Sequence, residues 1–471
     1  MSPYLYINGQ LVNSHQQKTI FNPATDEKIS SIYIADKTIA DQALNCAKDA
    51  EFNWGRLSIN KRIIWMRKLR SEFIKQEEYL RNCVHQETGK TWKDTLEDFQ
   101  LLIDSMEFYS KISSDYLATE TVIDDTHSHA IIKIPVGTCI AYLAWNFPLL
   151  NIGYKLAPAM ASGCPIIIKP SIQTPLSAYA VGEICHSIGL PKGAVQILAG
   201  DDIELGNHMS SSTIPAMLTL IGSTNTGLKV IEKSTTSIKH FSMELGGDAP
   251  FIILDDANQE LAADILHSIK FTNAGQTCVS ANRVFVADSI LESFIEKVLQ
   301  RLNTIKLGWH RDSDATMGAL INKTARNRIH ELVVDALNKG ATCLSGGDFS
   351  PEETGSFYPP TLLVNVTADM KIYQQEIFGP VIAISSFKNI QEAINKANMT
   401  KSGLASYIFT NDSSIQKVMT DELDFGEVHV NGIKYSIELP HTGIKQSGIG
   451  CDCSKYSLND FTALKRISTP L

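Results

Sequence analysis

The sequence predicts an α/β protein with two lobes, each built on a mainly parallel sheet. From Ile131 onward, short apolar runs alternate with stretches of helical spacing, as in parallel strands joined by helices. A second series of apolar runs begins near Ala249, directly after the Gly246-Gly247 pair. The length of 471 residues is enough for several domains of roughly 100–200 residues each.

The N-terminal part of the chain has a different pattern. Apolar residues on both sides of Asn8-Gly9 predict a β-hairpin, because this dipeptide favours the tight turn between two strands. Helical spacing of apolar residues follows over residues 36–53, 60–88 and 94–117. The sequence therefore predicts a hairpin followed by three helical segments.

The apolar runs expected to form strands of the first lobe lie at residues 137–145, 165–168, 194–198 and 216–221. Those of the second lobe lie at residues 250–254, 283–286, 381–385, 406–409 and 427–430. Helical segments such as residues 288–302 and 323–339 fall between them. Two lobes of this kind commonly bind a ligand in the cleft between them, so a cleft site is expected.

Composition and charge exclude several classes of function. The formal net charge is -9, so the surface has no general attraction for nucleic acid or anionic membranes. Prolines, glycines and asparagines interrupt the long apolar stretch at residues 134–154, which argues against a membrane helix there. The N-terminus lacks the basic and apolar regions of a secretory signal, and the nine cysteines contain no Cys-x-x-Cys pair. We therefore expect a cytoplasmic protein without a metal site.

Two segments carry side chains suited to covalent and acid–base catalysis. In FTNAGQTC, residues 271–278, small and polar neighbours would leave the sulfur of Cys278 accessible, as a thiolate nucleophile requires. The alternative is a buried structural cysteine. In MELGGD, residues 243–248, partial burial of Glu244 before the Gly-Gly turn would raise its pKa and suit a general base. The alternative is a solvated or capping glutamate.

Two further segments suggest hydrogen-bond donors. In AWNFP, residues 144–148, Asn146 ends an apolar strand and could donate its amide to a developing oxyanion, or it could be an ordinary turn residue. In GSTNTG, residues 222–227, free N–H groups at a helix start could bind phosphate, or the segment could be a simple strand–helix turn. Its spacing matches neither Gly-x-Gly-x-x-Gly nor the Walker loop.

Taken together, these segments resemble the aldehyde dehydrogenase superfamily. The four segments occur in one order, together with KPS at residues 169–171 and EIFGP at residues 376–380. The resemblance extends from NPAT at residues 22–25 and ETGK at residues 87–90 to GIKQSG at residues 443–448. The tail over residues 425–450 looks like the lactaldehyde and glycolaldehyde branch.

The resemblance implies two Rossmann-like parallel-sheet lobes and a small β hairpin for oligomerisation. The cofactor-binding domain would comprise residues 1–114 and 136–246, and the catalytic domain residues 247–458. Residues 115–135 and 459–471 would form the oligomerisation element. Pairing of its edge strands between subunits would give a homodimer or homotetramer.

The resemblance also implies a reaction, the oxidation of an aldehyde to the carboxylic acid with NAD or NADP. The thiolate of Cys278 would attack the carbonyl and form a thiohemiacetal and then a thioester. The Asn146 amide and the backbone N–H of Cys278 would hold the oxyanion, and Glu244 would activate water for deacylation. Lys155 would help to position groups or relay protons near the Asn146 loop.

Cofactor and substrate contacts are implied in the same way. The implied cofactor contacts are Trp145, Lys169, Ser171, Gly222, Ser223, Gly227, Glu376 and Phe378. The implied substrate contacts are Phe147, Tyr154, Tyr435 and His441. Two of the departures from the family pattern concern the cofactor and the substrate. Ile172 replaces the glutamate usual in NAD-preferring members, and Tyr154 replaces the arginine usual in succinate-semialdehyde dehydrogenases.

Two alternative functions stay open on the sequence. A coenzyme A-acylating aldehyde dehydrogenase would pass the acyl group to a thiol and not to an activated water, and Glu244 argues against it. A non-catalytic scaffold protein of the same fold is the second alternative. The joint presence of Asn146, Glu244 and Cys278 argues against that one.

Overall fold

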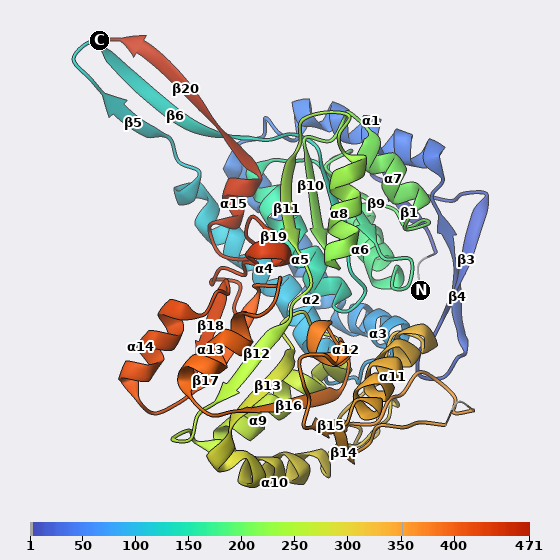
Figure 1. Ribbon diagram of the computed structural model, residues 1–471. Coiled ribbons are helices and arrows are strands. Elements are labelled where there is room, and N and C mark those ends of the chain that lie inside the picture. Colours follow the sequence, from blue (N-terminus) through green and yellow to red (C-terminus); the bar gives the residue numbers. More distant parts are fainter. Residues whose placement is uncertain (1–2, 351) are drawn as a thin grey trace.

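An eight-stranded sheet forms the centre of the first lobe, with the strand order β19-β11-β10-β7-β8-β9-β1-β2. The computed structural model describes residues 3–350 and 352–471 of the chain (Figure 1). The strands of this sheet are β1 (Leu5–Ile7), β2 (Gln10–Val12), β7 (Cys139–Leu143), β8 (Ile166–Pro170), β9 (Val195–Ile197), β10 (Met217–Ile221), β11 (His240–Glu244) and β19 (Gly448–Ile449). The five inner strands pair in parallel, whereas β1, β2 and β19 are antiparallel additions at the edges.

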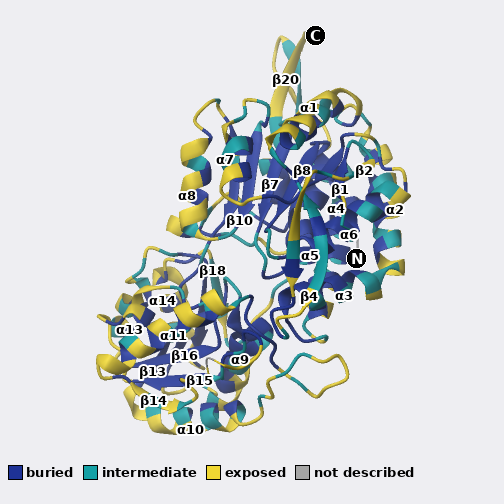
Figure 2. Cartoon of the chain, turned by 90° about the vertical axis from the view of Figure 1, so that its right-hand side faces the viewer, coloured by how far each residue is buried: buried dark blue, intermediate teal, exposed yellow. Residues whose placement is uncertain are grey.

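Helices cover both faces of this sheet. They are α1 (Lys37–Asn53), α2 (Ile59–Lys75), α3 (Glu77–Thr88), α4 (Thr95–Tyr116), α5 (Pro148–Ser162), α6 (Leu176–Ser187), α7 (Glu204–Ser211), α8 (Thr224–Lys233) and α15 (Ser457–Asp460). Strands β7, β8 and β10 are buried at every position (Figure 2). This burial on both faces explains why their sequences read as uninterrupted apolar runs.

A seven-stranded sheet forms the second lobe, with the order β14-β15-β16-β13-β12-β17-β18. Its strands are β12 (Ala249–Ile253), β13 (Ala281–Ala287), β14 (Thr342–Ser345), β15 (Thr361–Val364), β16 (Val381–Phe387), β17 (Ala405–Phe409) and β18 (Glu427–Val430). Its helices are α9 (Gln259–Phe271), α10 (Leu291–Leu302), α11 (Lys323–Asn338), α12 (Lys371–Gln374), α13 (Ile390–Asn398) and α14 (Ser413–Glu422), with the short 3-10 segments η1 (Thr272–Gly275), η2 (Asp288–Ile290) and η3 (Lys445–Ser447). Except for β14, neighbouring strands pair in parallel, so the predicted α/β fold with two parallel-sheet lobes is confirmed.

A three-stranded antiparallel sheet projects away from the two lobes (Figure 1). It consists of β5 (Glu120–Ile123), β6 (His127–Pro135) and β20 (Thr462–Pro470), with β6 in the middle. The strands β6 and β20 pair over their whole length, from Thr462 opposite Pro135 to Pro470 opposite His127. The small β hairpin expected from the resemblance is therefore present and joined by the C-terminal strand.

The structure differs from the sequence-based expectation in three places. The helical segment at residues 60–88 is two helices, because the chain leaves helical geometry at Gln76. A separate two-stranded sheet, β3 (Gln16–Phe21) with β4 (Lys28–Ile34), was not predicted, since its residues are mostly polar or exposed. The chain also returns to the first lobe before residue 458, because β19 pairs with β11 and Ile437, Cys453 and Leu458 pack in the first core.

Among the described residues, no helix is both long and apolar enough to span a bilayer. The apolar stretch at residues 134–154 instead contributes to β6, β7 and the beginning of α5.

A buried carboxylate joins two helices of the first lobe. Glu87, near the end of α3, is fully buried and accepts hydrogen bonds from the backbone N–H groups of Leu176 (2.5 Å) and Ser177 (3.0 Å). These two N–H groups begin α6 and have no partner within their own helix. Glu87 therefore caps α6 from a neighbouring helix.

We expect Glu87→Ala to lower the free energy of unfolding by about 2 kcal/mol, because it leaves buried N–H groups without an acceptor. The shift of the urea unfolding midpoint measures this loss. The matched control is Glu78→Ala, which removes an exposed carboxylate of the same helix that pairs with Arg311. An equal shift for both variants would contradict the capping role of Glu87.

Candidate active site

A cleft of about 1890 Å³ lies between the lobes and is lined by residues of both. Most of the sequence-predicted site residues line it, namely Asn146, Glu244 and Cys278 together with Trp145, Phe147, Tyr154, Lys169, Ser171, Gly222, Ser223, Glu376, Phe378, Tyr435 and His441. Lys155 and Gly227 are not part of its lining. The volume exceeds that of a typical site for one small ligand, so the cleft has room for two ligands side by side.

A strained turn presents Cys278 to the cleft. Three successive residues of η1 have left-handed backbone angles, with φ of 50° at Asn273, 53° at Ala274 and 73° at Gly275. Glycine adopts this conformation freely, but the other two residues do so at a cost in energy. A Cβ atom at Gly275 would also lie only 2.5 Å from the carbonyl oxygen of Gly379. The surrounding packing therefore fixes the backbone just before the cysteine.

The Gly246-Gly247 pair brings the end of β11 close to the same turn. A Cβ atom at Gly247 would lie 2.1 Å from the carbonyl oxygen of Cys278, a contact that no larger residue could make. Glu244, the last residue of β11, lies only three positions earlier. The absence of a side chain at Gly247 thus lets the candidate base and the candidate nucleophile share one region of the cleft.

Asn146 lies in the loop between β7 and α5 and is held from both lobes. Its side-chain amide donates a hydrogen bond to the carbonyl oxygen of Gln276 (3.1 Å). Its own carbonyl oxygen accepts from the Asn273 amide (3.0 Å) and from the ammonium group of Lys90 (2.8 Å). These bonds fix the Asn146 amide beside the turn that carries Cys278.

Sequence reasoning assigned no role to Lys90, although ETGK was part of the resemblance. Lys90 is fully buried, forms an ion pair with Asp98 (3.2 Å) and lies over the ring of Phe147. A lysine is rarely buried without a specific partner. The Lys90 side chain anchors the Asn146 loop. In the sequence Lys90 only follows the polar end of a helix by two residues, and nothing in that pattern predicts a contact with Asn146.

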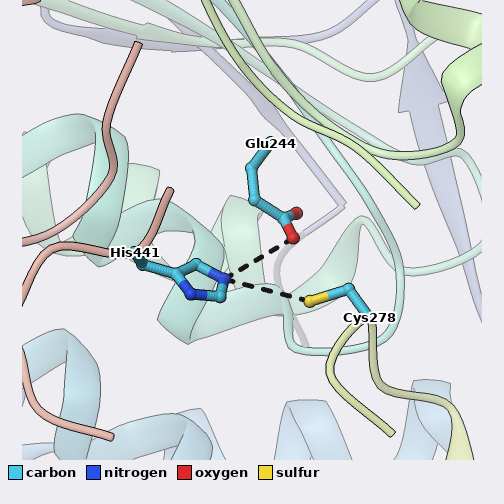
Figure 3. A group of neighbouring side chains, drawn as sticks. All are labelled: Glu244, Cys278 and His441. Carbon is cyan, nitrogen blue, oxygen red and sulfur yellow. Dashed lines mark hydrogen bonds and ion pairs between the residues drawn. The ribbon is translucent and has the colours of Figure 1, made fainter. Parts of the chain in front are cut away.

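Glu244, Cys278 and His441 meet at one point of the cleft (Figure 3). The Nε2 atom of His441 lies 3.5 Å from Oε1 of Glu244 and 4.0 Å from Sγ of Cys278. One ligating atom from each residue lies within 4.8 Å of the others. His441 was expected as a substrate contact, and the structure places it directly against the candidate nucleophile and the candidate base.

Charge and burial act on these groups in opposite directions. Burial, reinforced by the nearby Glu244 carboxylate, raises the pKa of the Cys278 thiol. Burial lowers the pKa of His441, but its contacts with Cys278, Glu244 and Glu427 outweigh this and raise it well above the ordinary value. The cluster therefore disfavours a thiolate without a cation beside it, and it makes His441 a stronger base than a free imidazole.

Glu427, at the beginning of β18, is a site residue that sequence reasoning missed. Its Oε1 atom lies 2.6 Å from Nδ1 of His441, and its Oε2 atom lies 3.4 Å from Nε2 of His429. Burial raises the pKa of Glu427, but its bonds to His429 and His441 prevail and lower it to about 2. The side chain is therefore a carboxylate at neutral pH.

Lys155 does not line the cleft itself but contacts a residue that does. It is fully buried in α5, and its ammonium group lies 2.5 Å from the carboxylate of Asp452. Asp452 lines the cleft and exchanges two backbone hydrogen bonds with His441. Lys155 thus balances the charge of a residue next to His441, and among its described contacts none reaches Asn146.

The start of α8 forms an end of the cleft that is suited to bind a phosphate group. Ser223 caps this helix, since its hydroxyl accepts from the N–H of Thr226 (3.2 Å), and Gly222 and Ser223 line the cleft. A helix N-terminus favours anions through its free N–H groups and its dipole. Gly227 is not part of the cleft lining, and a Cβ atom there would lie 2.8 Å from the Leu245 side chain. The absence of a side chain at Gly227 therefore allows close packing of α8.

Lys169 and Asp202 form an ion pair in the same half of the cleft. The ammonium group of Lys169 lies 2.5 Å from the carboxylate of Asp202, and both residues line the cleft. Sequence reasoning singled out Lys169 but not Asp202. Ile172 is half-buried against the first core and lies outside the cleft lining.

At the other end of the cofactor region, Glu376 accepts a hydrogen bond from the N–H of Gly247 (3.2 Å). Burial raises the pKa of Glu376 to about 8. The rings of Trp145 and Phe378 meet edge to face, with centroids 5.4 Å apart. The cleft lining thus includes a helix N-terminus, a lysine–carboxylate pair, a half-buried carboxyl group and two aromatic rings, and this set fits a nicotinamide dinucleotide.

Comparison with known proteins gives one family. The model described as "Aldehyde dehydrogenase family" matches residues 11–467. A mitochondrial succinate-semialdehyde dehydrogenase from Oryza sativa subsp. japonica is 35% identical over 98% of this chain and 88% of its own length. A D-glyceraldehyde dehydrogenase (NADP(+)) from Picrophilus torridus is 33% identical over 98% of this chain and 95% of its own length.

The solved structures agree with this assignment of the fold. The chain superposes on the crystal structure of an Escherichia coli NADP-dependent enzyme with a TM-score of 0.97 at 32% identity. The match covers 100% of this chain and 98% of the other. At this similarity the likeness extends to the whole two-lobed architecture.

Proposed function

The chain belongs to the aldehyde dehydrogenase family and oxidises aldehydes to carboxylic acids with NAD or NADP, and we propose that Cys278, Asn146 and Glu244 carry out this reaction. The single observation that carries the assignment is that these three side chains line one cleft. A nucleophile, an amide donor and a carboxylate base around one carbonyl are the groups that acyl transfer through a thioester needs.

Acylation begins at the sulfur of Cys278, which adds to the aldehyde carbon and forms a thiohemiacetal. The negative charge that develops on the carbonyl oxygen is held by the amide of Asn146 and the backbone N–H of Cys278. The hydrogen bonds of Asn146 to Gln276, Lys90 and Asn273 support this role, because they hold the loop in place before substrate arrives. A donor that does not have to reorganise stabilises the oxyanion most.

When bound, NAD or NADP supplies the acceptor for the hydride that leaves the thiohemiacetal carbon. We propose that the start of α8 with Gly222 and Ser223 receives the pyrophosphate, and that Lys169 and Ser171 contact the adenosine ribose. Glu376 would hold the nicotinamide ribose, and Trp145 and Phe378 would bound the ring.

Deacylation uses Glu244 as the base that takes a proton from water, so that the water adds to the thioester and the sulfur leaves. The position of Glu244 supports this role, because it is 5% exposed and the one described partner of its Oε1 atom is Nε2 of His441, at a long 3.5 Å. A coenzyme A-acylating enzyme would not need this base.

The substrate end of the cleft supports a hydroxylated, uncharged aldehyde. Phe147 and Tyr154 offer ring surface, whereas Tyr435, His441 and Glu427 offer polar groups. Glu427 is anionic at neutral pH and would repel a substrate carboxylate. A preference for uncharged hydroxyaldehydes would differ from the succinate semialdehyde in the name of the rice relative. It would agree with the D-glyceraldehyde in the name of the Picrophilus relative.

An aldehyde panel tests the function. The absorbance of reduced nicotinamide is followed at about 25 °C. The substrates are glycolaldehyde, glyceraldehyde and succinate semialdehyde, each with and without coenzyme A. We expect turnover without coenzyme A and a higher kcat/KM for the two hydroxyaldehydes. Strict dependence on coenzyme A would replace the hydrolytic reaction with the acylating one, and absence of all turnover with every aldehyde would favour a scaffold protein.

In the same assay, Cys278→Ala should abolish turnover while cofactor binding stays intact. Glu244→Gln should keep a burst of about one reduced cofactor per subunit and slow the steady state by about 100-fold, because only deacylation needs the base. Rapid-mixing absorbance measures both phases. Full activity of Cys278→Ala, or an unchanged steady state in Glu244→Gln, would overturn the respective assignment.

We further propose that Asp202 gives the enzyme a preference for NAD. Ile172 lacks the carboxylate usual in NAD-preferring members, but Asp202 supplies one at 2.5 Å from Lys169. A carboxylate in this place accepts bonds from ribose hydroxyls and repels a 2′-phosphate.

Asp202→Ala should therefore raise the ratio of kcat/KM for NADP over NAD by about tenfold, equivalent to about 1.4 kcal/mol. Ile172→Glu should shift the ratio in the opposite direction. Steady-state titrations with both nucleotides measure the ratio. The control is Glu204→Ala, which removes a nearby exposed carboxylate that pairs with Lys37 and does not line the cleft. An unchanged ratio in Asp202→Ala would contradict the proposal.

The projecting sheet supports a homodimer or homotetramer. Within the described part of the chain, its outer strands β5 and β20 each have a single neighbouring strand, and Val122, Ile123, Leu464 and Ile467 on them are exposed. Open strand edges with apolar side chains favour pairing with another chain.

We expect the double variant Leu464→Lys with Ile467→Lys to lower the molar mass in light scattering from that of an oligomer toward 51.9 kDa, the mass of one chain. Each substitution places a charge on a surface that a partner subunit would cover. Ile64→Lys, an exposed apolar residue of α2, is the control. A parent protein of 51.9 kDa would refute the oligomer outright.

A further inference from the structure

The candidate nucleophile has a histidine on one side, and this histidine has a carboxylate on its far side. Sγ of Cys278 lies 4.0 Å from Nε2 of His441, and Nδ1 of the same ring lies 2.6 Å from Oε1 of Glu427. His441 is also fixed through its backbone, which exchanges two hydrogen bonds with Asp452 at 2.8 and 2.9 Å. Three segments of the chain thus converge on His441, two of them on its ring and one on its backbone.

Glu427 determines which ring nitrogen carries the proton. An ionised carboxylate only accepts hydrogen bonds, so Nδ1 of His441 must donate to it. In the neutral imidazole the lone pair then resides on Nε2, which is the atom that faces the thiol. Cys278 as nucleophile, His441 as base and Glu427 as orienting group thus have the arrangement by which a histidine activates a side-chain nucleophile.

We propose that His441, held by Glu427, is the base that ionises the thiol of Cys278. This inference rests on the proposed function, in which Cys278 is the nucleophile. The S–H bond breaks, its proton forms the Nε2–H bond, and the electron pair stays on sulfur. The thiolate then adds to the aldehyde carbon, and the π pair of the carbonyl moves to its oxygen. When water later cleaves the thioester, the pair of the C–S bond returns to sulfur.

The environment explains why this thiol requires such a partner. Cys278 lies in a cleft beside the carboxylate of Glu244, and both burial and that negative charge oppose a thiolate. An imidazolium between thiolate and carboxylate balances both charges, since Nε2 lies within 4.0 Å of Sγ and 3.5 Å of Oε1 of Glu244. Glu244 then serves deacylation, and His441 serves acylation.

The other groups around His441 do not compete for this role. Asp452 faces it through the backbone, and its carboxylate is engaged by Lys155 at 2.5 Å. The ring of Tyr435 meets it edge-on at 6.2 Å, and the Tyr435 hydroxyl bonds to Tyr407. The buried thiol of Cys453 is a further titratable neighbour, and burial raises its pKa to about 12, so it stays neutral.

Alkylation of Cys278 as a function of pH tests the proposal without aldehyde or cofactor. The full-length enzyme is treated with iodoacetamide between pH 5 and pH 10 (a range spanning roughly the imidazole and thiol pKa values), and modification of Cys278 is followed by peptide mass spectrometry. The rate reports the thiolate fraction of this one residue.

His441→Phe keeps an aromatic ring but removes the base. We expect the inflection of the alkylation rate to move to higher pH and the rate at pH 7 to fall about tenfold or more, as a rise of about one pKa unit requires. Glu427→Gln should move the inflection in the same direction but less. Thermal unfolding and cofactor binding check the fold, and His441→Gln, which retains a polar side chain without a base of this pKa, replaces His441→Phe if that variant is unfolded.

The matched control is His429→Phe. His429 shares the same Glu427 carboxylate, at 3.4 Å, and its ring stacks on Tyr407, but it makes no described contact with Cys278. Its inflection should stay close to that of the parent enzyme. An equal shift in His429→Phe and His441→Phe would overturn the proposal, because the effect would then be a general disturbance of Glu427.

Two results separate this proposal from the proposed function. If His441→Phe and Glu427→Gln raise KM but leave the alkylation profile unchanged, His441 contacts substrate and is not the base, while the dehydrogenase assignment stands. If Cys278→Ala keeps full turnover, the nucleophile itself is misassigned and both inferences fail. A shifted alkylation profile together with a slowed burst in His441→Phe supports both.

Discussion

The backbone carbonyl of Asn146 is the contact on which the site depends. It accepts one hydrogen bond from Lys90 in the first lobe and another from Asn273 in the second. Through these two bonds the amide donor and the turn that presents the nucleophile keep a fixed relation, although they belong to different sheets. Each bond is modest by itself, but both donors are buried, so loss of the acceptor would leave Lys90 with only Asp98 and Asn273 with only the Gln276 carbonyl oxygen among the described hydrogen-bond partners of their side chains.

Around this contact the chain concentrates ionisable groups that burial penalises. Glu244, Glu376, Glu427 and Asp452 all line the cleft, and each is held by a histidine, a lysine or a backbone N–H. Such an arrangement is costly for stability and is typical of sites that tune protonation. The left-handed backbone at Asn273 and Ala274 adds strain at the same place. The rest of the two cores, which consists of closely packed apolar residues, must offset these costs.

Much of the fold could be predicted because its central strands are buried on both faces. The apolar runs that became β8, β10, β12 and β18 were found close to their true bounds. The strand β11 has polar residues at alternate positions, β3 is mostly exposed, and β4 mixes polar and apolar residues that are mostly half-buried, so no continuous apolar run marked them. At the site, the joint order of several motifs indicated Cys278, Glu244 and Asn146. Glu427, Asp202 and Lys90 stayed hidden, because each owes its role to a partner that only the folded chain brings near.

The path of the C-terminal segment has a consequence for how the protein is made. Leu458 and Phe461 belong to the core of the first lobe, and β19 completes the edge of its sheet beside β11. During synthesis most of the first lobe therefore leaves the ribosome before the C-terminal residues that complete its core. The whole second lobe must be synthesised before those residues can pack. A nascent chain of this topology exposes apolar surface of the first lobe while the second lobe is being synthesised, and chaperones would have the most to bind during that interval.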